Sequence, residues 1–349
     1  MDVGRTILVA GVSRYLGGRF ARLLSADPAV SRVVGVDVVP PTDDVGDTEF
    51  VRADIRSPVI AKVISRADVD TVVHLNVIAT PTSAGGRVSM KEINVIGTMQ
   101  LLAACQKAEG VRRLVVKSTA GVYGSSPRDP ALFTEDTEAK VLPRSGWGKD
   151  SVEVEGYVRG FSRRRPDVEV VQLRFANIVG PGMRTALTDY FSLSVLPTVL
   201  GFDPRFQLVH EDDSLEALRL ATLGPTTGVV NVAGDGVLLL SQGARILGRP
   251  TVPVPGRATG PVAQVLRRSG LVDFTGEQLR FLSYGRVLDT TRMRTRLGFE
   301  PRYTTREAFT DFARSRGLSG PLNVDVVGLA ERLIRRGAGR VLQRVGSGT

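Results

Sequence analysis

The feature that most constrains the fold is an alternation between short apolar runs and stretches of helical periodicity in the first half of the chain. The apolar runs cover residues 6–10, 33–38, 71–75, 113–118 and 168–174, and the helical stretches cover residues 13–25, 58–65, 92–108 and 150–163. Strands that are apolar on both faces and alternate with helices are typical of a parallel sheet covered on both sides. The sequence therefore predicts an α/β protein with a doubly wound parallel sheet and right-handed crossovers.

The rhythm changes after Gly180-Pro181, and this change predicts a smaller second region. We expect a core formed by residues 1–180 and rejoined by residues 206–235, a smaller C-terminal region formed by residues 181–205 and 236–320, and a tail at 321–349. Residues 228–232 are expected to form a last buried strand, the Pro/Gly-rich residues 251–261 a loop, and residues 291–297 a helix.

The tail is a basic amphipathic segment. Its apolar positions alternate with arginines, and the pattern is broken at Gly337 and Gly339. We interpret it as a helix that covers the domain and exposes its arginine face to solvent. Contact with an anionic membrane surface or a partner helix is the alternative.

The composition excludes several classes of site. The net charge is +10, with only six lysines among 46 basic residues, so the excess is arginine spread along the chain. Such a charge favours acidic partners without choosing among them, but no basic module studded with aromatic residues suggests nucleic-acid binding. The single Cys105 excludes an intramolecular disulfide or a cysteine-based zinc site, and two histidines are too few for a His-rich metal site. No apolar run approaches the ~18 residues of a membrane span, so we expect a cytoplasmic protein.

A glycine-containing turn connects the first strand to the first helix. Gly11 permits a tight turn, and Gly17, six residues later, lets the helix pack closely against the sheet. The helix N-terminus would then present free N–H groups to a pyrophosphate. Asp37 ends the second strand, where a carboxylate accepts hydrogen bonds from ribose hydroxyls and repels a 2′-phosphate. This arrangement indicates NAD rather than NADP, and a turn without a ligand is the alternative.

Several short motifs follow one another along the chain. They are Gly11 to Gly17, Asp54-Ile55, His74-Leu75-Asn76, Asn94 to Thr98, Ser118 to Gly124, Arg174 to Pro181, Val209 to Asp213 and Leu297 to Pro301. In this order they resemble the motifs of the NAD-dependent epimerase/dehydratase family, the extended short-chain dehydrogenases/reductases that include UDP-glucose 4-epimerase. The resemblance covers most of residues 5–315. The resemblance implies a Rossmann-type sheet with a smaller C-terminal substrate-binding region, NAD as cofactor and a nucleotide-sugar-like ligand. It also implies a homodimer formed through helices near residues 92–108 and 150–163.

The resemblance assigns roles to individual residues. The cofactor-binding positions are Gly11, Ser13, Arg14, Tyr15, Leu16, Gly17, Asp37, Asp54, Ile55, Leu75, Asn76, Asn94 and Ser118. Asn177 occupies the place of an asparagine that contacts the diphosphate of a nucleotide sugar. Arg205 and Arg286 are candidates for further phosphate contacts, with Arg292 as an alternative. Arg14 replaces the middle glycine of the family's turn, where it would either meet a phosphate or favour NADP; Asp37 favours NAD.

The chain departs from the family's pattern at the catalytic pair. The family uses Tyr-x-x-x-Lys on one helix together with a Ser/Thr hydroxyl, which Thr119 would supply. No Tyr-x-x-x-Lys exists in this chain: Trp147 stands at the tyrosine position and Ser151 at the lysine position. An indole N–H donates a hydrogen bond but is no base at neutral pH. Lys149, two residues before the lysine position, is an alternative contact for the ribose.

Three functions therefore stay open. The first is a nucleotide-sugar epimerase-like protein with an atypical active site, and the second is a non-catalytic NAD-binding regulatory or structural protein on the same scaffold. The third is a true epimerase or reductase with relocated acid–base groups such as Thr119 and Lys149. His74 and His210 are interpreted as structural, with Asp213 expected to cap the helix that follows His210.

Overall fold

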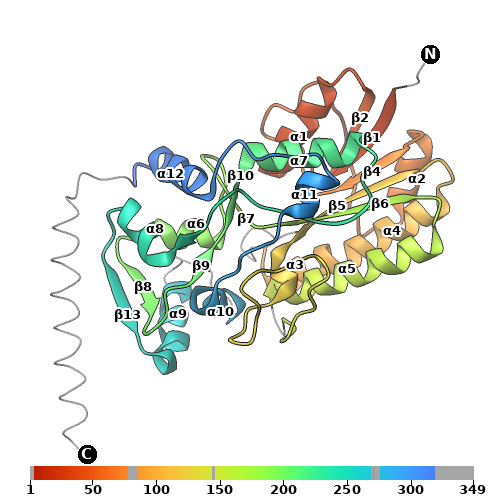
Figure 1. The fold of residues 1–349 in the computed structure, drawn as a ribbon. Helices are drawn as coiled ribbons and strands as arrows, with labels where there is room; N and C mark the ends of the chain where they lie inside the picture. The colour runs from red at the N-terminus through yellow and green to blue at the C-terminus, as the bar shows by residue number, and fades with distance from the viewer. Residues whose placement is uncertain (1–3, 78–84, 144–145, 269, 271–275, 319–349) are drawn as a thin grey trace, which may run out of the picture.

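The structure is a computed structural model that describes residues 4–77, 85–143, 146–268, 270 and 276–318 (Figure 1). Its centre is a seven-stranded sheet in the order β11-β6-β5-β4-β1-β2-β3, and all six neighbouring pairs are parallel. The strands are β1 (Arg5–Ala10), β2 (Val30–Asp37), β3 (Glu49–Arg52), β4 (Thr71–His74), β5 (Arg113–Thr119), β6 (Glu169–Phe175) and β11 (Gly228–Val232). The predicted doubly wound parallel sheet is confirmed. The edge strand β3 was missing from the prediction, because its residues are largely exposed and carry no buried apolar run.

Helices cover both faces of this sheet, as predicted. On one face lie α1 (Tyr15–Ser25) and α7 (Glu211–Leu223), packed in one apolar cluster with strand residues such as Val9 and Val115. On the other face lie α2 (Val59–Arg66), α4 (Thr98–Lys107) and α5 (Gly146–Arg164), packed with alternate strand residues such as Leu8 and Val116. Because successive side chains of a strand point to opposite faces of the sheet, one apolar run contributes to the packed cores on both faces.

The helix predicted at 92–108 has a more complex form. Helix α3 (Arg87–Lys91) leads into a π-helical turn at Glu92–Gly97, and α4 follows without a break. A Cβ on Gly97 would lie 2.7 Å from Cδ1 of Ile55, so the glycine lets this turn approach the loop after β3. Helix α5 begins at Gly146, four residues before the predicted start.

The C-terminal region has its own apolar cluster, centred on Phe191, Phe206 and Phe309. Its elements are α6 (Ala186–Phe191), β8 (Leu196–Val199), β9 (Arg205–Phe206), β12 (Leu238–Leu239), α8 (Leu240–Ile246), β13 (Thr251–Val254), α9 (Thr259–Arg268), α10 (Gly276–Tyr284) and α12 (Thr305–Ser315). The loop prediction for 251–261 is wrong, since β13 pairs in parallel with β8 and α9 begins at Thr259. A two-stranded sheet tolerates Pro253 because both of its strands are edges.

Two short strands and a helix connect this region to the core. Strand β7 (Asn177–Val179) pairs in parallel with β10 (Leu208–His210), and α11 (Thr291–Thr295) is two residues shorter than the predicted helix. The helix cap after β10 also differs from the prediction. His210 is the N-cap of α7 and its Nδ1 accepts the N–H of Asp212, whereas the Asp213 carboxylate accepts the N–H groups of Arg302 and Tyr303.

The tail predicted at 321–349 lies outside the described residues. Among the residues that are described, no helix is both long and apolar enough to span a bilayer. The division into a core and a substrate-binding region stays a prediction.

Candidate functional site

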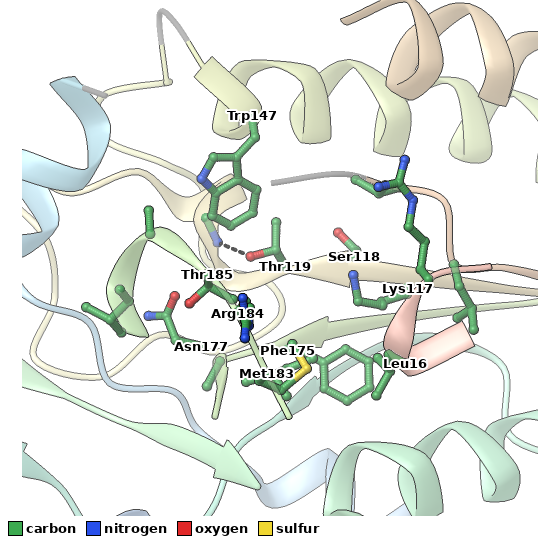
Figure 2. Close-up of a pocket in the computed structure, with 18 of the residues that line it drawn as sticks. Leu16, Lys117, Ser118, Thr119, Trp147, Phe175, Asn177, Met183, Arg184 and Thr185 are labelled. Carbon is green, nitrogen blue, oxygen red and sulfur yellow. Dashed lines mark hydrogen bonds between the residues drawn. The ribbon is translucent and has the colours of Figure 1, made fainter. Parts of the chain in front are cut away.

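A pocket of about 560 Å³ opens at the carboxyl ends of the central strands, between the sheet and the C-terminal region. Its wall includes the β1–α1 turn, the end of β5, the start of α5, the segment after β6 and part of α10. Figure 2 shows Lys117 and Leu16 toward one end of the pocket and Arg184 and Asn177 toward the other. Ligands of open α/β sheets bind at this position, outside the carboxyl ends of the strands.

The β1–α1 turn has the geometry of an anion-binding site. Gly11 has a φ of +95°, and a Cβ on Gly17 would lie 2.0 Å from the Gly11 carbonyl oxygen, so both positions require glycine. Arg14 has an extended backbone (φ −85°, ψ 146°) that needs no glycine. It makes no side-chain capping bond to α1, and the first turn of α1 contains no acidic residue. Residues 13–17 all line the pocket, so the positive end of α1 faces it.

Asp37 lies beside this turn, at the end of β2. Its buried carboxylate accepts the N–H of Ser13 at 3.2 Å and the N–H of Val38 at 2.8 Å. The Ser13 hydroxyl donates to the carbonyl of Val39. The Asp37 carboxylate is therefore held in place at the end of β2, next to the turn, and its contact with a ribose stays a prediction.

Tyr15 fastens the turn to the segment after β7. Its hydroxyl donates to Oε1 of Glu211 at 2.7 Å, and the N–H groups of Gly182 and Met183 donate to Oε2 of the same carboxylate at 3.1 Å. Arg19 also donates to Glu211 at 2.7 Å. Burial, together with the Glu211 carboxylate, raises the pKa of Tyr15 to about 12. Tyr15 is thus a wall of the pocket that stays protonated at neutral pH.

Ser118 and Thr119 are the last two residues of β5, and their hydroxyls have different hydrogen-bond partners. Oγ1 of Thr119 accepts the N–H of Gly121 at 3.0 Å, so its proton stays available to a ligand in the pocket that it lines. The Ser118 hydroxyl instead donates to the buried carboxylate of Glu155 on α5. Glu155 also receives two hydrogen bonds from Arg174, and this network holds the end of β5 against α5.

Trp147 stands near the start of α5 and its indole lies over the turn after β5. A Cβ on Gly121 would come within 2.7 Å of the indole, so the ring packs directly on this glycine. Ser151 is buried outside the pocket wall, and its hydroxyl donates to the carbonyl of Trp147 at 2.8 Å. Lys149 is exposed, pairs with Glu153 at 3.8 Å and is also absent from the pocket wall. Of these three predicted catalytic positions, only Trp147 faces the pocket.

The three predicted substrate contacts are placed differently. Asn177, on β7, lines the pocket (Figure 2). Arg286 also lines it, while its guanidinium donates to the Gly124 carbonyl and to the Ser125 hydroxyl at 2.9 Å. Arg205 is exposed on β9 and lies outside the pocket wall, because its strand turns that side chain to solvent.

The remaining predicted cofactor residues surround the turn at different distances from the pocket. Leu75 lines it, whereas Asn76 packs behind Gly11 with a buried Oδ1 that has no hydrogen-bond partner among the described residues. Asp54 forms an ion pair with Arg56 at 2.7 Å, which lowers the pKa of its carboxyl group. Ile55 packs on Gly97, and Asn94 is fully buried and donates to Asp150 of α5 at 3.4 Å. Asp54, Ile55, Asn76 and Asn94 are not part of the pocket wall.

The fold and this pocket can be compared with known proteins. The profile of the NAD dependent epimerase/dehydratase family matches residues 7–233. The chain belongs to the NAD dependent epimerase/dehydratase family. It is 48% identical over 319 residues to uncharacterized protein Rv0501 of Mycobacterium tuberculosis, covering 90% of this chain and 85% of that protein.

Solved structures share the fold of this family member. UDP-glucose 4-epimerase of Thermotoga maritima, solved with UDP-glucose, matches with a TM-score of 0.68 and 20% identity, covering 89% of this chain and 98% of that one. UDP-glucuronic acid 4-epimerase of Bacillus cereus, in complex with UDP-glucuronic acid and NAD, matches with a TM-score of 0.67 and 20% identity, covering 89% and 99%. At these identities the likeness establishes the shared architecture.

Sequence reasoning missed two basic residues of the pocket wall in this family member. Lys117 lies on β5 two residues before Thr119, and Arg184 lies in the segment before α6 (Figure 2). A signal for Lys117 was present, because a lysine directly follows the apolar residues Leu114 to Val116 of this strand in a chain that has few lysines. Arg184 follows Gly180-Pro181 in a segment without periodicity, so its direction could not be predicted.

Proposed function

We propose that this epimerase/dehydratase-family protein binds NAD between the β1–α1 turn and Thr119, and binds a nucleotide-sugar-like ligand beyond it, toward Asn177 and Arg184. The observation that carries the proposal is the continuity of one pocket from the phosphate-binding turn to Thr119 and Asn177. A volume of about 560 Å³ is within the range of small-molecule sites.

The residues beside the turn fit a dinucleotide. The uncapped N-terminus of α1 suits a pyrophosphate, and the fixed Asp37 carboxylate suits free ribose hydroxyls while disfavouring a 2′-phosphate. The orphaned Oδ1 of Asn76 is a further polar atom that a ligand or water would satisfy. When bound, NAD would supply the oxidant for a hydroxyl-bearing carbon of the ligand.

The charge of the pocket supports an anionic ligand. Its described wall contains four basic residues and no aspartate or glutamate; the basic residues are Arg14, Lys117, Arg184 and Arg286. Guanidinium groups favour phosphate oxygens, so the diphosphate of a nucleotide sugar suits the end near Arg184 and Arg286. Two of the similar solved structures hold UDP-glucose and UDP-glucuronic acid, and these are the first ligands to assay.

A non-catalytic NAD-binding role is the second candidate, and the residues of α5 favour it. Trp147 has no basic atom, and the Ser151 hydroxyl and the Lys149 amine are directed to other partners. The two candidates predict different results for one substitution.

Thr119→Ala separates these roles. If the protein is an enzyme, we expect UDP-glucose-dependent reduction of NAD to fall about 100-fold or more, because the substrate hydroxyl loses its orienting partner. NAD binding should change little. Thr119→Ser, which keeps the cap on Gly121, should retain most of the rate. Equal rates for wild type and Thr119→Ala would contradict a catalytic Thr119.

The chain's single tryptophan offers a direct binding assay, because Trp147 lines the pocket. We expect saturable changes in its fluorescence when NAD, and then UDP-glucose, are added. Trp147→Phe should abolish the optical signal, while calorimetry still detects NAD binding. The proposal fails if neither compound changes the fluorescence or produces heat of binding.

We further propose a homodimer formed through α4 and α5, which pack side by side on the same face of the sheet. This layer leaves Ile96, Met99 and Tyr157 exposed, and burying them would favour association. Light scattering tests the proposal: a mass of one chain would contradict it.

A further inference from the structure

Lys117 is an unusual residue for its position in the sheet. It lies near the end of β5, the strand between β4 and β6, and it contributes a half-buried side chain to the pocket wall (Figure 2). Thr119 is two residues further along the same strand. Alternate residues of a strand point to the same face, about 7 Å apart, so the two side chains share one side of the pocket.

The Lys117 amine is also unused by the protein. Among the described residues, Nζ has no hydrogen-bond or ion-pair partner, although the neighbouring Ser118 hydroxyl and the Arg174 guanidinium are both bound to Glu155. A lysine without a partner in a sheet costs desolvation free energy, and such groups concentrate at functional sites.

The other polar groups of the described pocket wall are unsuited to accept a proton. The guanidinium groups of Arg14, Arg184 and Arg286 are hydrogen-bond donors without an acceptor atom, and Tyr15 donates its hydroxyl proton to Glu211. Thr119 is a hydroxyl whose proton is not acidic. Lys117 is therefore the one group of this described wall that can accept and return a proton.

We propose that Lys117 is the proton-transfer residue of this site and performs from β5 the acid–base step for which α5 has no Tyr-x-x-x-Lys pair. This inference rests on the proposed function, because it requires a hydroxyl-bearing ligand beside Thr119 and NAD as the oxidant. The O–H bond of the ligand breaks, and its proton passes to the Nζ lone pair. Bound NAD would supply the oxidant that takes the hydride from the same carbon, which would then become a carbonyl carbon. In the reverse step, the ammonium group returns the proton to the oxygen.

The charges around Lys117 agree with this role. Burial lowers its pKa to about 8, so the neutral amine becomes accessible just above neutral pH. On β4, the buried His74 is kept neutral, since burial and the Lys117 charge lower its pKa to about 4. The groups that face the same pocket are Arg14 and Tyr15 of the turn, Arg184 before α6, and Arg286, while α5 contributes the uncharged Trp147. No carboxylate of the described wall stabilises the ammonium form.

The ionisation of Lys117 can be measured directly in the protein without ligand. With ¹³C at lysine Cε, the six lysines give few NMR resonances, and Lys117→Met identifies the one of interest. We expect this resonance to titrate near pH 8, whereas exposed lysines titrate near ~10.4. A Lys117 resonance that titrates with the other five overturns the proposal.

The rate of UDP-glucose-dependent NAD reduction provides the second readout. For wild type we expect a rise with pH that has its midpoint near 8, because the neutral amine is the reactive form. In both Lys117→Met and Lys117→Arg, this rate should fall by about 100-fold or more, and its pH profile should lose the inflection near 8. The matched control is Lys62→Met, on the exposed side of α2, which should keep the wild-type profile. The wild-type profile needs no variant and so stands even if a substitution impairs folding.

The outcomes separate the two proposals. If wild type binds neither NAD nor UDP-glucose, the proposed function fails. If it binds both and neither reduces NAD with UDP-glucose or UDP-glucuronic acid nor epimerises either ligand, the non-catalytic role holds and the Lys117 assignment falls. If wild type is active and Lys117→Arg is equally active, a fixed positive charge suffices and proton transfer by Lys117 is overturned.

Discussion

Replacing Arg174 with methionine should lower the free energy of unfolding by about 3–5 kcal/mol, the largest stability effect that we expect. The guanidinium donates to both oxygens of Glu155 and to the Tyr123 hydroxyl, and the ion-pair side chains are only 13% and 6% exposed. Methionine would leave the Glu155 carboxylate buried without its counter-charge. Chemical denaturation of the wild type and of Arg174→Met at pH 7 measures the difference in their free energies of unfolding.

An exposed arginine provides the matched control. Arg32 pairs with Glu49, and both side chains are about half exposed. Solvent screens such pairs, so Arg32→Met should cost less than about 1 kcal/mol. If both variants lose the same free energy of unfolding, burial does not make the Arg174–Glu155 pair more important for stability than the exposed pair.

Gly17→Ala should weaken NAD binding by about 10- to 100-fold. The added Cβ would lie 2.0 Å from the Gly11 carbonyl oxygen, so the start of α1 must move away from β1. Overpacking of this kind costs about 1–3 kcal/mol, and the displaced N–H groups are those that would bind the pyrophosphate. Trp147 fluorescence and calorimetry with NAD measure the loss.

Gly156→Ala is the control for this substitution. Gly156 is exposed on α5, and a Cβ there would meet no atom within 4 Å. NAD affinity should stay at the wild-type value, and the helix should gain about 0.5–1 kcal/mol because alanine restricts the unfolded chain. Unchanged NAD affinity in Gly17→Ala would show that the β1–α1 turn does not hold the dinucleotide.

The sheet was predictable because its strands contain continuous apolar runs and its helices have a clear period, as for 6–10 and 13–25. Elements without these signals were missed. Strand β13 contains Pro253 and is held by its partner β8, and the π-helical turn at Glu92–Gly97 depends on close packing with Ile55. Both depend on tertiary contacts that local periodicity does not encode.

Site residues could be predicted where the backbone conformation requires one residue type. They were harder to predict where membership of the pocket depends on the direction of a side chain. Gly11 and Gly17 are required by φ and by close approach, and each takes the predicted place. Lys149 and Arg205 are exposed and outside the pocket wall, whereas Lys117 and Arg184 line it. Which way a long basic side chain turns depends on the strand register and loop path, which the sequence does not reveal.

The most direct test of this account is the nucleotide content of the purified protein. The protein would be denatured, any released nucleotide identified by mass, and the nucleotide-free protein titrated with NAD and NADP. We expect NAD to be released, or to bind the nucleotide-free protein much more tightly than NADP, because Asp37 disfavours a 2′-phosphate. If neither dinucleotide is released or bound, Arg14 has closed the turn to phosphate and the NAD-dependent account is wrong.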